Sequence, residues 1–220
     1  MIKHLRVCNG ISVNPYLNLS LEKRLMDLVA PGECILYLWQ NRNTVVIGKN
    51  QNPWAECRTG LLAEEEGHLA RRLSGGGAVF HDLGNLNFTF LVNEEDYNLD
   101  RQLTVIEKAC AMAGIHTERS GRNDVLANGR KFSGNAFYHS DGKAYHHGTL
   151  LISADMEKMQ RYLSPSKAKL AAKGVSSVRS RVVNLQELSS GLTCENMKEY
   201  MIRAFCQVYG AECEDVALRD

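Results

Sequence analysis

Apolar residues recur at helical spacing in several stretches of the chain. Residues 18–29 place Leu21, Leu25 and Leu28 on one helical face, and Pro31-Gly32 predicts the end of that helix. The same kind of pattern predicts further helices over Leu61–Glu66, Leu103–Ala113, a stretch that follows the capping residue Asp155, and residues 194–209.

Short apolar runs typical of strands lie between these helices, namely Cys34–Trp39, Thr44–Ile47, Ala78–Phe80 and Asn87–Val92. Strand-like runs that come in groups, with helices between the groups, favour an α/β fold of the α+β type. We therefore expect mixed, largely antiparallel sheets with flanking helices. No repeat or low-complexity linker marks a boundary, so residues 1–220 are expected to form one domain.

Two hairpins are predicted in the second half of the chain. Asn128-Gly129 suits a tight turn, and it separates Asp124–Ala127 from Lys131–Ser133. A second hairpin is predicted between Phe132–His139 and Tyr145–Leu151. The turn residues of the first hairpin therefore bring Asp124 and Lys131 into neighbouring strands.

Composition limits the classes of function. The chain has 220 residues, of which 44% are hydrophobic, and its formal net charge is +1, so no global field favours nucleic acid or an anionic membrane. The seven cysteines are odd in number and form no Cys-x-x-Cys pair. We therefore expect free thiols in a reducing cytosol rather than a zinc site or a disulfide framework. The sequence shows no signal peptide and no apolar run that spans a bilayer, which predicts a cytoplasmic protein.

The strongest local signal for chemistry is the stretch from Ala70 to His81. It contains Arg71, Arg72, a serine and the three successive glycines Gly75 to Gly77, in front of a strand-like run. Exposed glycine N–H groups beside fixed positive charge form a site for phosphate or carboxylate. The spacing matches neither the phosphate-loop motif nor the dinucleotide fingerprint. The alternative is a glycine-rich hairpin whose arginines face water.

A second candidate follows in the first hairpin. An ammonium at Lys131, in an apolar and glycine-bearing setting, would bind a carboxylate and a phosphate together and neutralise charge as they react. Asp124 would orient a cation or a nucleotide amine. The alternative makes Lys131 a solvated hairpin lysine and Asp124 a turn former.

Other candidates are less specific. His146-His147 lies in a strand, so only one of the two histidines points into a given pocket, and no acidic or cysteine partner at ligand spacing indicates a metal. Trp39 and the run Val45-Val46-Ile47 suit a core or the wall of an acyl tunnel. The basic segment from Lys173 to Asn184 suits an anion-contacting or partner-contacting loop, or a plain surface loop.

Taken in order, these motifs resemble the lipoate–protein ligase A family. The resemblance runs from about residue 10 to about residue 210 and is carried by Asn50-Gln-Asn-Pro-Trp54, Arg71-Arg-Leu-Ser-Gly-Gly-Gly-Ala-Val-Phe-His81, Gly121-Arg-Asn-Asp124, Arg130-Lys-Phe-Ser-Gly134, His146-His-Gly-Thr-Leu150 and Lys173-Gly-Val-Ser-Ser-Val-Arg-Ser-Arg-Val182.

The resemblance implies a catalytic domain of the biotin and lipoyl ligase type. Such an enzyme activates lipoate with Mg-ATP to lipoyl-AMP and transfers the acyl group to a lysine of a lipoyl domain or of the glycine-cleavage H protein. Carried over by motif, Arg72 and the four residues Gly77, Ala78, Val79 and Phe80 would contact ATP. Lys131 would contact ATP and the lipoate carboxyl and act in catalysis. Further assignments are Arg71, Trp39 and His147 to the lipoate pocket and Asp124 to Mg²⁺ or the adenylate.

One departure from the family concerns length. Two-domain bacterial members continue into a small accessory domain, and this chain ends at Asp220, near the end of the catalytic domain. Either the chain is a fragment of a longer protein, or the accessory part is a separate polypeptide, as in bipartite members. A catalytic domain without the accessory part is expected to bind lipoyl-AMP or transfer from it, but to form lipoyl-AMP slowly.

Three rival readings stay open from the sequence. A lipoyl or octanoyl transferase would carry the acyl group on a cysteine without ATP, but in one branch that cysteine follows a proline, and here Ser166 follows Pro165. A non-catalytic relative that binds lipoyl domains is the second reading. A biotin ligase is the third, and the motif spellings fit lipoate better.

Overall fold

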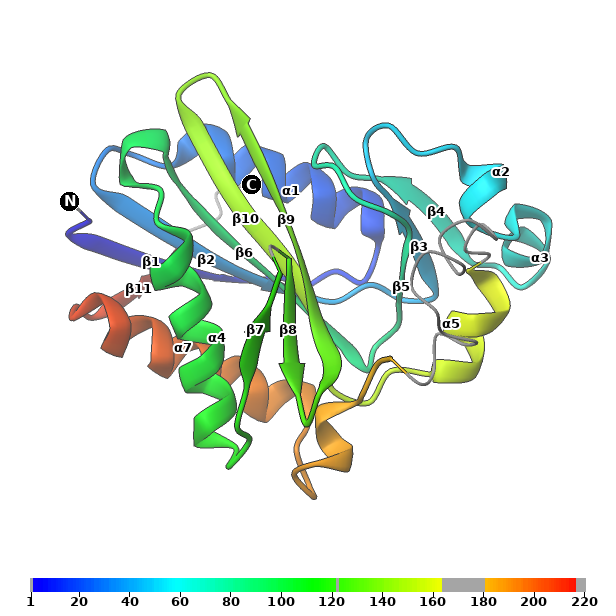
Figure 1. The fold of residues 1–220 in the computed structure, drawn as a ribbon. Coiled ribbons are helices and arrows are strands. Elements are labelled where there is room, and N and C mark those ends of the chain that lie inside the picture. Colours follow the sequence, from blue (N-terminus) through cyan, green and yellow to red (C-terminus); the bar gives the residue numbers. More distant parts are fainter. Residues whose placement is uncertain (1, 122, 164–180, 217–220) are drawn as a thin grey trace.

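A computed structural model describes residues 2–121, 123–163 and 181–216. Its described strands form a large and a small sheet, set side by side (Figure 1). In spatial order the large sheet contains β11 (Cys213–Asp215), β1 (His4–Asn9), β2 (Glu33–Trp39), β6 (Asn85–Asn93), β10 (Lys143–Leu151), β9 (Arg130–Ser140), β8 (Asp124–Ala127) and β7 (Glu118–Ser120). The small sheet contains β4 (His68–Arg71), β3 (Thr44–Ile47) and β5 (Val79–His81).

Most neighbouring strands run antiparallel, and the exceptions are β1, which is parallel to both of its neighbours, and the β3–β4 pair. The described helices are α1 (Pro15–Leu28), α2 (Pro53–Glu56), α3 (Thr59–Glu64), α4 (Leu99–Met112), α5 (Met156–Tyr162) and α7 (Cys194–Tyr209), with short 3-10 turns at Glu94–Asp96 and Leu185–Glu187. No helix in the described part of the chain is long and apolar enough to cross a bilayer. The predicted fold class is confirmed.

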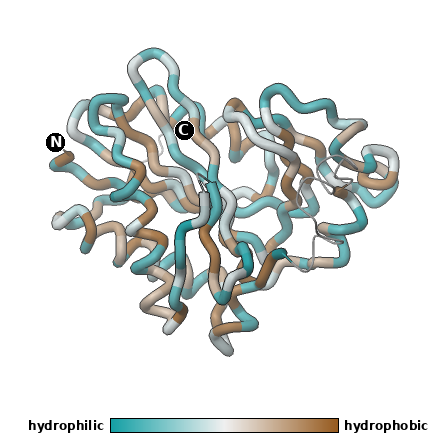
Figure 2. The backbone as a smooth tube through the Cα atoms, in the orientation of Figure 1, coloured by the Kyte–Doolittle hydropathy of each residue, from teal (hydrophilic) through white to brown (hydrophobic). Residues whose placement is uncertain are grey.

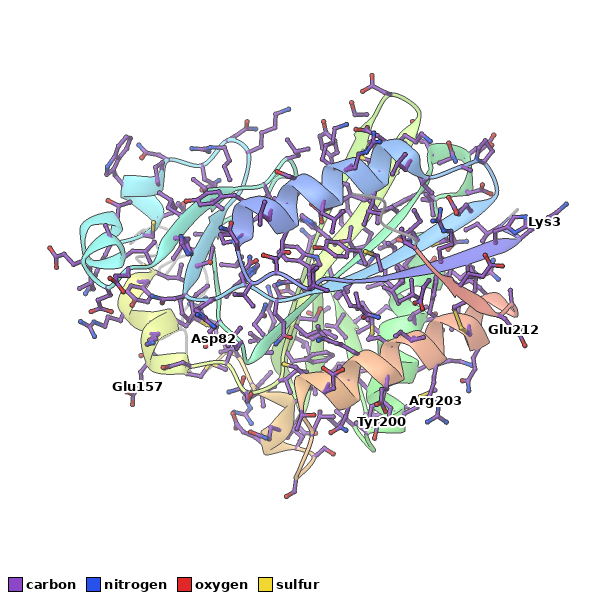
Figure 3. All side chains as sticks on the ribbon, turned by 180° about the vertical axis from the view of Figure 1, so that it is seen from behind. Lys3, Asp82, Glu157, Tyr200, Arg203 and Glu212 are labelled. Carbon is purple, nitrogen blue, oxygen red and sulfur yellow. A yellow bond between two sulfur atoms is a disulfide. The ribbon has the colours of Figure 1, made fainter. Side chains whose placement is uncertain are left out.

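Helices cover both faces of the large sheet. Strand β2 is buried along its whole length, and its side chains alternate between two cores. Leu36 belongs to the core that α4 and α7 cover, whereas Tyr37 belongs to the core beneath α1. Figure 2 shows the hydrophobic stretches running through these interior strands, and Figure 3 shows charged side chains such as Glu157 and Arg203 pointing outward.

A third core lies under the small sheet. Phe80 of β5 packs against Tyr162 of α5 with ring centroids 5.3 Å apart, and both side chains are buried. Val45 and Leu62 of α3 belong to the same cluster. The small sheet is therefore anchored by its own apolar contacts, and the glycine-rich stretch joins its strands β4 and β5 beside the large sheet.

Both predicted hairpins are confirmed. A single strand, β9, pairs with β8 on one side and with β10 on the other. The turn residues Asn128 and Gly129 have positive φ angles of 50° and 70°, as the Asn-Gly pair predicts. The predicted strand at Thr44–Ile47 and the predicted helix over residues 194–209 have the observed bounds. Asp155 caps α5 through bonds that its side chain accepts from two backbone amides.

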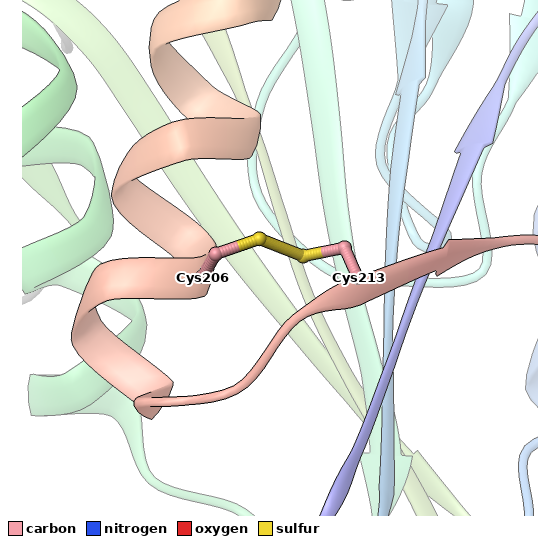
Figure 4. The surroundings of a disulfide bond; sticks show 2 residues. All are labelled: Cys206 and Cys213. Atoms are coloured by element: carbon pink, nitrogen blue, oxygen red, sulfur yellow. A yellow bond between two sulfur atoms is a disulfide. The ribbon is translucent and has the colours of Figure 1, made fainter.

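One prediction about the cysteines is wrong. Cys206 and Cys213 form a disulfide that joins the last turn of α7 to β11 (Figure 4). Cys206 lies on the helix predicted over residues 194–209, whereas Cys213 lies on strand β11. The odd total of seven hid this pair because the remaining five cysteines are free. The bond spans a sequence separation of 7 and fixes the edge strand that pairs with β1.

The disulfide predicts a redox-dependent stability. Cys213→Ser should lower the free energy of unfolding of the oxidised protein by about 2 kcal/mol, because an open chain has more unfolded-state entropy than a looped one. Urea unfolding measures this. In excess dithiothreitol the variant and the unmodified chain should unfold together, and Cys194→Ser serves as the control for a free cysteine. Equal stability of the variant and the unmodified chain under oxidising conditions would contradict the prediction.

Candidate functional site

Two cavities meet at the junction of the two sheets. The first has a volume of about 490 Å³ and the second of about 180 Å³. Their walls share six residues: Gly77, Val79, Asp124, Lys131, Gly134 and Thr149. The glycine-rich stretch and the first hairpin, which the sequence singled out separately, therefore lie against one another along the common edge of two cavities.

A β-bulge places Lys131 on this edge. In the pairing of β8 with β9, Val125 faces Ser133 but Leu126 faces Lys131, so Phe132 is the extra residue. Without the bulge, Lys131 would share the face of Val125, which is buried in the core. The extra residue instead turns Lys131 to the face that carries Asp124 and the cavities, while Phe132 is buried in the core.

The side chain of Lys131 is held by its surroundings. Its Nζ forms an ion pair with Asp124 Oδ1 at 2.7 Å, and both side chains are about one third exposed (37% and 34%). Its backbone N–H donates to the carbonyl of Arg181, and its carbonyl accepts from the N–H of Val183. A Cβ on Gly134 would lie 2.9 Å from Nζ, so glycine leaves the space that the ammonium occupies.

Arg72 organises the glycine-rich stretch from within. Its guanidinium donates to the carbonyls of Gly75 and Gly77 and, at 3.2 Å, to that of Val46. Burial lowers its pKa, yet a guanidinium with such partners stays charged at neutral pH. The positive φ of Gly76 (95°) and the 2.7 Å between a Cβ there and Arg72 Nη2 explain why glycine is needed at this position.

The hydrogen bonds from Arg72 to these carbonyls, called here the Arg72 clasp, also orient backbone donors. A trans peptide points its N–H away from its C=O, and the described residues contain no cis bond. Because the carbonyls of Gly75 and Gly77 face Arg72, the N–H groups of Gly76 and Ala78 face away from it. These N–H groups can donate to an anion, and Arg72 fixes their orientation through the carbonyls on the opposite side of the loop.

A buried chain of polar groups ends at the second cavity. His147 Nδ1 lies 2.8 Å from Glu22 Oε1, and His147 Nε2 lies 2.7 Å from the Ser74 hydroxyl. The carboxylate of Glu22 also accepts from Thr89, whose hydroxyl oxygen accepts from Trp39 Nε1. Since a carboxylate only accepts, His147 Nδ1 carries a proton and donates to Glu22. Helix α1 is thus tied to the glycine-rich stretch through the cavity wall.

The candidate residues divide between the cavities. Ala78 and Phe80 line the first cavity, and Trp39, Arg72 and His147 line the second. Arg71 lies outside both, in an outer groove, where its Nη1 donates to the carbonyls of the β3–α2 connection. Its observed contacts hold the backbone of that connection.

No pattern in the sequence indicated Glu22. The candidate basic segment from Lys173 to Asn184 is described only from residue 181 onward. Glu22 is only 2% exposed and lies one helical turn from the buried Asn18, but a lone glutamate on a predicted leucine face gave no signal. Residues 173–180 and the pair Pro165-Ser166 lie outside the described residues. Among the described residues no group of three or more His, Cys, Asp or Glu side chains is placed to hold a metal ion.

Two buried histidines predict a pH-dependent stability. Burial lowers the pKa of His81 and of His146 to about 3, from an ordinary value of 6.5. The unfolded chain therefore binds more protons between these values, so stability is lost as pH falls below about 6.5, by up to about 1.4 kcal/mol per pH unit for each histidine. Urea unfolding from pH 7 to pH 5 measures the slope. The exposed His116 gives the control His116→Gln, and a flat profile would contradict the prediction.

A matched glycine pair tests the packing of the loop. A Cβ on Gly48 would lie 2.1 Å from the carbonyl oxygen of Gly76, whereas one on Gly60 would meet nothing within 4 Å. Gly48→Ala should cost about 1–3 kcal/mol of stability and weaken the binding of pyrophosphate, used here as an anion probe of the loop. Gly60→Ala should be neutral or stabilise by at most about 1 kcal/mol. Urea unfolding and titration calorimetry check both, and equal behaviour of the two variants would refute the packing argument.

Comparison with known proteins is consistent with this geometry. A lipoate-protein ligase A of Bdellovibrio bacteriovorus is 44% identical over 217 residues, which are 97% of this chain and 64% of that protein's length. The structure of P. falciparum LipL1 in complex with lipoate is 34% identical with a TM-score of 0.83, over 96% of this chain and 66% of that one. The chain thus spans somewhat less than two thirds of the length of these relatives.

The same fold occurs at lower identity. A bi-partite lipoate protein ligase of Thermoplasma acidophilum, solved in a study with its E2 lipoyl domain, has a TM-score of 0.86 at 22% identity, over 100% of this chain and 89% of that one. The sequence model of the family described as the lipoyl protein ligase A/B catalytic domain matches residues 14–206. The chain therefore belongs to the family of lipoyl protein ligase A/B catalytic domains.

Proposed function

We propose that this chain activates lipoate with Mg-ATP to lipoyl-AMP and transfers the lipoyl group to a lysine of a lipoyl domain. The observation that carries the proposal is the shared edge of the two cavities, where Lys131, Asp124 and the glycine-rich stretch meet. Two substrates that react with one another need two adjoining sites and a cation between them.

The first cavity suits the nucleotide. Leu151, Met159 and Leu163 give one part of its wall an apolar surface against which an adenine ring would pack. The outward N–H groups of the glycine-rich stretch would donate hydrogen bonds to the phosphate oxygens, with Lys131 on the edge shared with the second cavity. The large volume fits a ligand of that size.

The second cavity suits the acyl substrate. Its lining contains Leu19, Trp39 and Val46, and Lys131 lies on the edge that it shares with the first cavity. An acyl chain would lie against the apolar wall with its carboxylate at the ammonium. The contacts with Ser74 and Glu22 occupy both ring nitrogens of His147 on this wall, whereas His81 Nε2 and Asn87 Nδ2 on the same lining have no hydrogen-bond partner among the described residues.

The chemistry of the first half-reaction follows from this placement. A carboxylate oxygen of lipoate attacks the α-phosphorus of ATP, the bond from that phosphorus to the β-phosphate oxygen breaks, and pyrophosphate leaves. Lys131 neutralises the charge that both anions bring together, and Asp124 fixes the position of its ammonium. Asp124 is also the carboxylate that would help phosphate oxygens hold Mg²⁺, which would supply further charge neutralisation; one carboxylate fits an ion bound largely through the substrate.

In the second half-reaction the acceptor amine attacks the acyl carbon and AMP leaves. AMP is a good leaving group, so the step needs placement of the amine more than a covalent nucleophile. No base is assigned for the amine proton. The proposed acceptors are apo lipoyl domains or the glycine-cleavage H protein, and a separate accessory-domain protein is a further proposed partner by resemblance to the bipartite members of the family.

The described cysteines disfavour transfer through a thioester, the route of the rival transferase. No described cysteine lines either cavity. Burial raises the pKa of the Cys8 and Cys194 thiols to about 11 and that of Cys110 to about 12, so these groups stay protonated and poorly nucleophilic.

The proposal is tested by incubating the chain with lipoate, Mg-ATP and an apo lipoyl domain, with mass spectrometry of the acceptor. Lipoylation that needs ATP is the expected result. A parallel incubation with synthetic lipoyl-AMP separates a missing first half-reaction from a missing second one. Acceptor modification from an acyl carrier protein without ATP, lost on alkylation of cysteine, would replace the ligase by the transferase.

Lys131→Ala should lower the rate of lipoyl-AMP formation by about 10²–10³-fold, because the charge between the two anions is no longer neutralised. The matched control is Arg130→Ala, which removes the neighbouring cation, a half-exposed partner of Glu187. Pyrophosphate release measures the rate, and circular dichroism verifies the fold. Full activity of Lys131→Ala would remove the central residue of the mechanism.

A further inference from the structure

The strand that carries His147 into the second cavity also buries His146 on its other face. His146 lines neither cavity and is fully buried. Its ring lies among Phe88, Phe90 and Phe137, with centroid distances of 5.4, 5.8 and 5.2 Å. A histidine in such an apolar cage has two polar atoms to satisfy, and their partners determine what it does.

Both ring nitrogens of His146 meet side-chain amides. Nε2 lies 2.7 Å from Asn135 Oδ1, and Nδ1 lies 3.1 Å from Oε1 of Gln102 on α4. Asn135 uses its Nδ2 to donate elsewhere, so its Oδ1 must accept and the imidazole proton is on Nε2. Nδ1 is then an acceptor, and rotating the Gln102 amide by half a turn brings to it the buried Nε2 that otherwise has no partner.

The chain of bonds continues to the proposed catalytic edge. Asn135 donates twice to the carbonyl of Asn123, from its Nδ2 at 3.0 Å and from its backbone N–H at 2.8 Å. Asn123 directly precedes Asp124, the partner of Lys131. A side chain that fixes the amide plane of Asn135 therefore fixes the backbone from which the Asp124 carboxylate projects.

We propose that His146 is a positioning residue for the ligase site, acting through Asn135 to hold the Asn123–Asp124 backbone so that Asp124 meets Lys131. The donation from Asn135 Nδ2 to the Asn123 carbonyl leaves Oδ1 as the acceptor and so selects the imidazole tautomer that donates to Asn135, while Gln102 of α4 faces the other ring nitrogen. The effect on catalysis rests on the proposed function, whereas the coupling of His146 to the hairpin does not. A histidine that only filled the core would stabilise the fold without influencing Asn135.

Two substitutions separate the roles of the ring nitrogens. The amide nitrogen of glutamine falls near the place of Nε2, and that of asparagine near the place of Nδ1. His146→Gln should keep the donor to Asn135, and His146→Asn should lose it. Both variants remove the ring from the phenylalanine cage, so both should lose stability.

The rate of lipoyl-AMP formation gives the first readout. In His146→Asn we expect kcat to fall about 10–100-fold with KM for ATP and lipoate within about 2-fold, because the misplaced Asp124 disturbs charge neutralisation during reaction more than binding. In His146→Gln we expect kcat within about 3-fold of the unmodified chain. Equal kcat values in the two variants would overturn the proposal.

A background substitution gives an internal control. In Asn135→Ala the acceptor of the histidine proton is absent, so the difference between the Gln and Asn variants at position 146 should disappear. A difference that persists in this background would show that His146 acts by another route, and would also overturn the proposal.

A structural readout separates this proposal from the proposed function. Nuclear magnetic resonance of ¹⁵N-histidine protein should show the Nε2–H tautomer of His146, with no titration between pH 5 and pH 8. The Asn135 backbone amide, which donates to Asn123, should exchange with solvent faster in His146→Asn than in His146→Gln. If the unmodified chain forms no lipoyl-AMP, the proposed function fails, and the exchange rates alone decide the coupling. Equal exchange rates in the two variants would exclude it.

Discussion

The site depends on one partly exposed ion pair, between Lys131 and Asp124, at the edge that the two described cavities share. A cation fully in water would be screened, and one fully buried would need a permanent partner. At about one third exposure the ammonium keeps its carboxylate partner and still faces both cavities. The bulge at Phe132 and the missing side chain of Gly134 are local departures from a regular hairpin, and each one serves to bring Nζ to this place.

Arg72 carries a buried charge of the site, and it has a different function from that of Lys131. Its N–H groups donate to carbonyls of its own loop and of Val46. These hydrogen bonds compensate much of the free-energy cost of burying a guanidinium. The loop therefore presents peptide N–H groups rather than a mobile side chain to an anion. A fixed backbone dipole needs no reorganisation when charge develops, which is the physical advantage of an electrostatic site of this kind.

Much of this arrangement is predictable from the sequence, and the remainder is not predictable for physical reasons. The hairpins follow from Asn128-Gly129 and from alternating side chains, and both are observed. The predicted buried face of α1 is wrong in part, because Leu28 is 48% exposed, while Asn18 and Glu22 are buried against the hydroxyls of Tyr37 and Thr89 on distant strands. Strand β1 has no turn signal, since parallel pairing with β2 needs a helix between them. The clasp of Arg72 depends on carbonyl directions that no residue pattern encodes.

The adjacent histidines of β10 show how one strand serves two purposes. Alternation sends His147 to the wall of the second cavity and His146 into the opposite core. Each imidazole is held between two polar partners on different elements, so each fixes a relation between parts of the fold. His147 ties α1 to the glycine-rich stretch, and His146 ties α4 to the segment before Asp124. The glycine-rich stretch and the first hairpin are therefore both connected to strand β10. The backbone of this one strand sets the distance between the N–H donors of the stretch and the ammonium of Lys131.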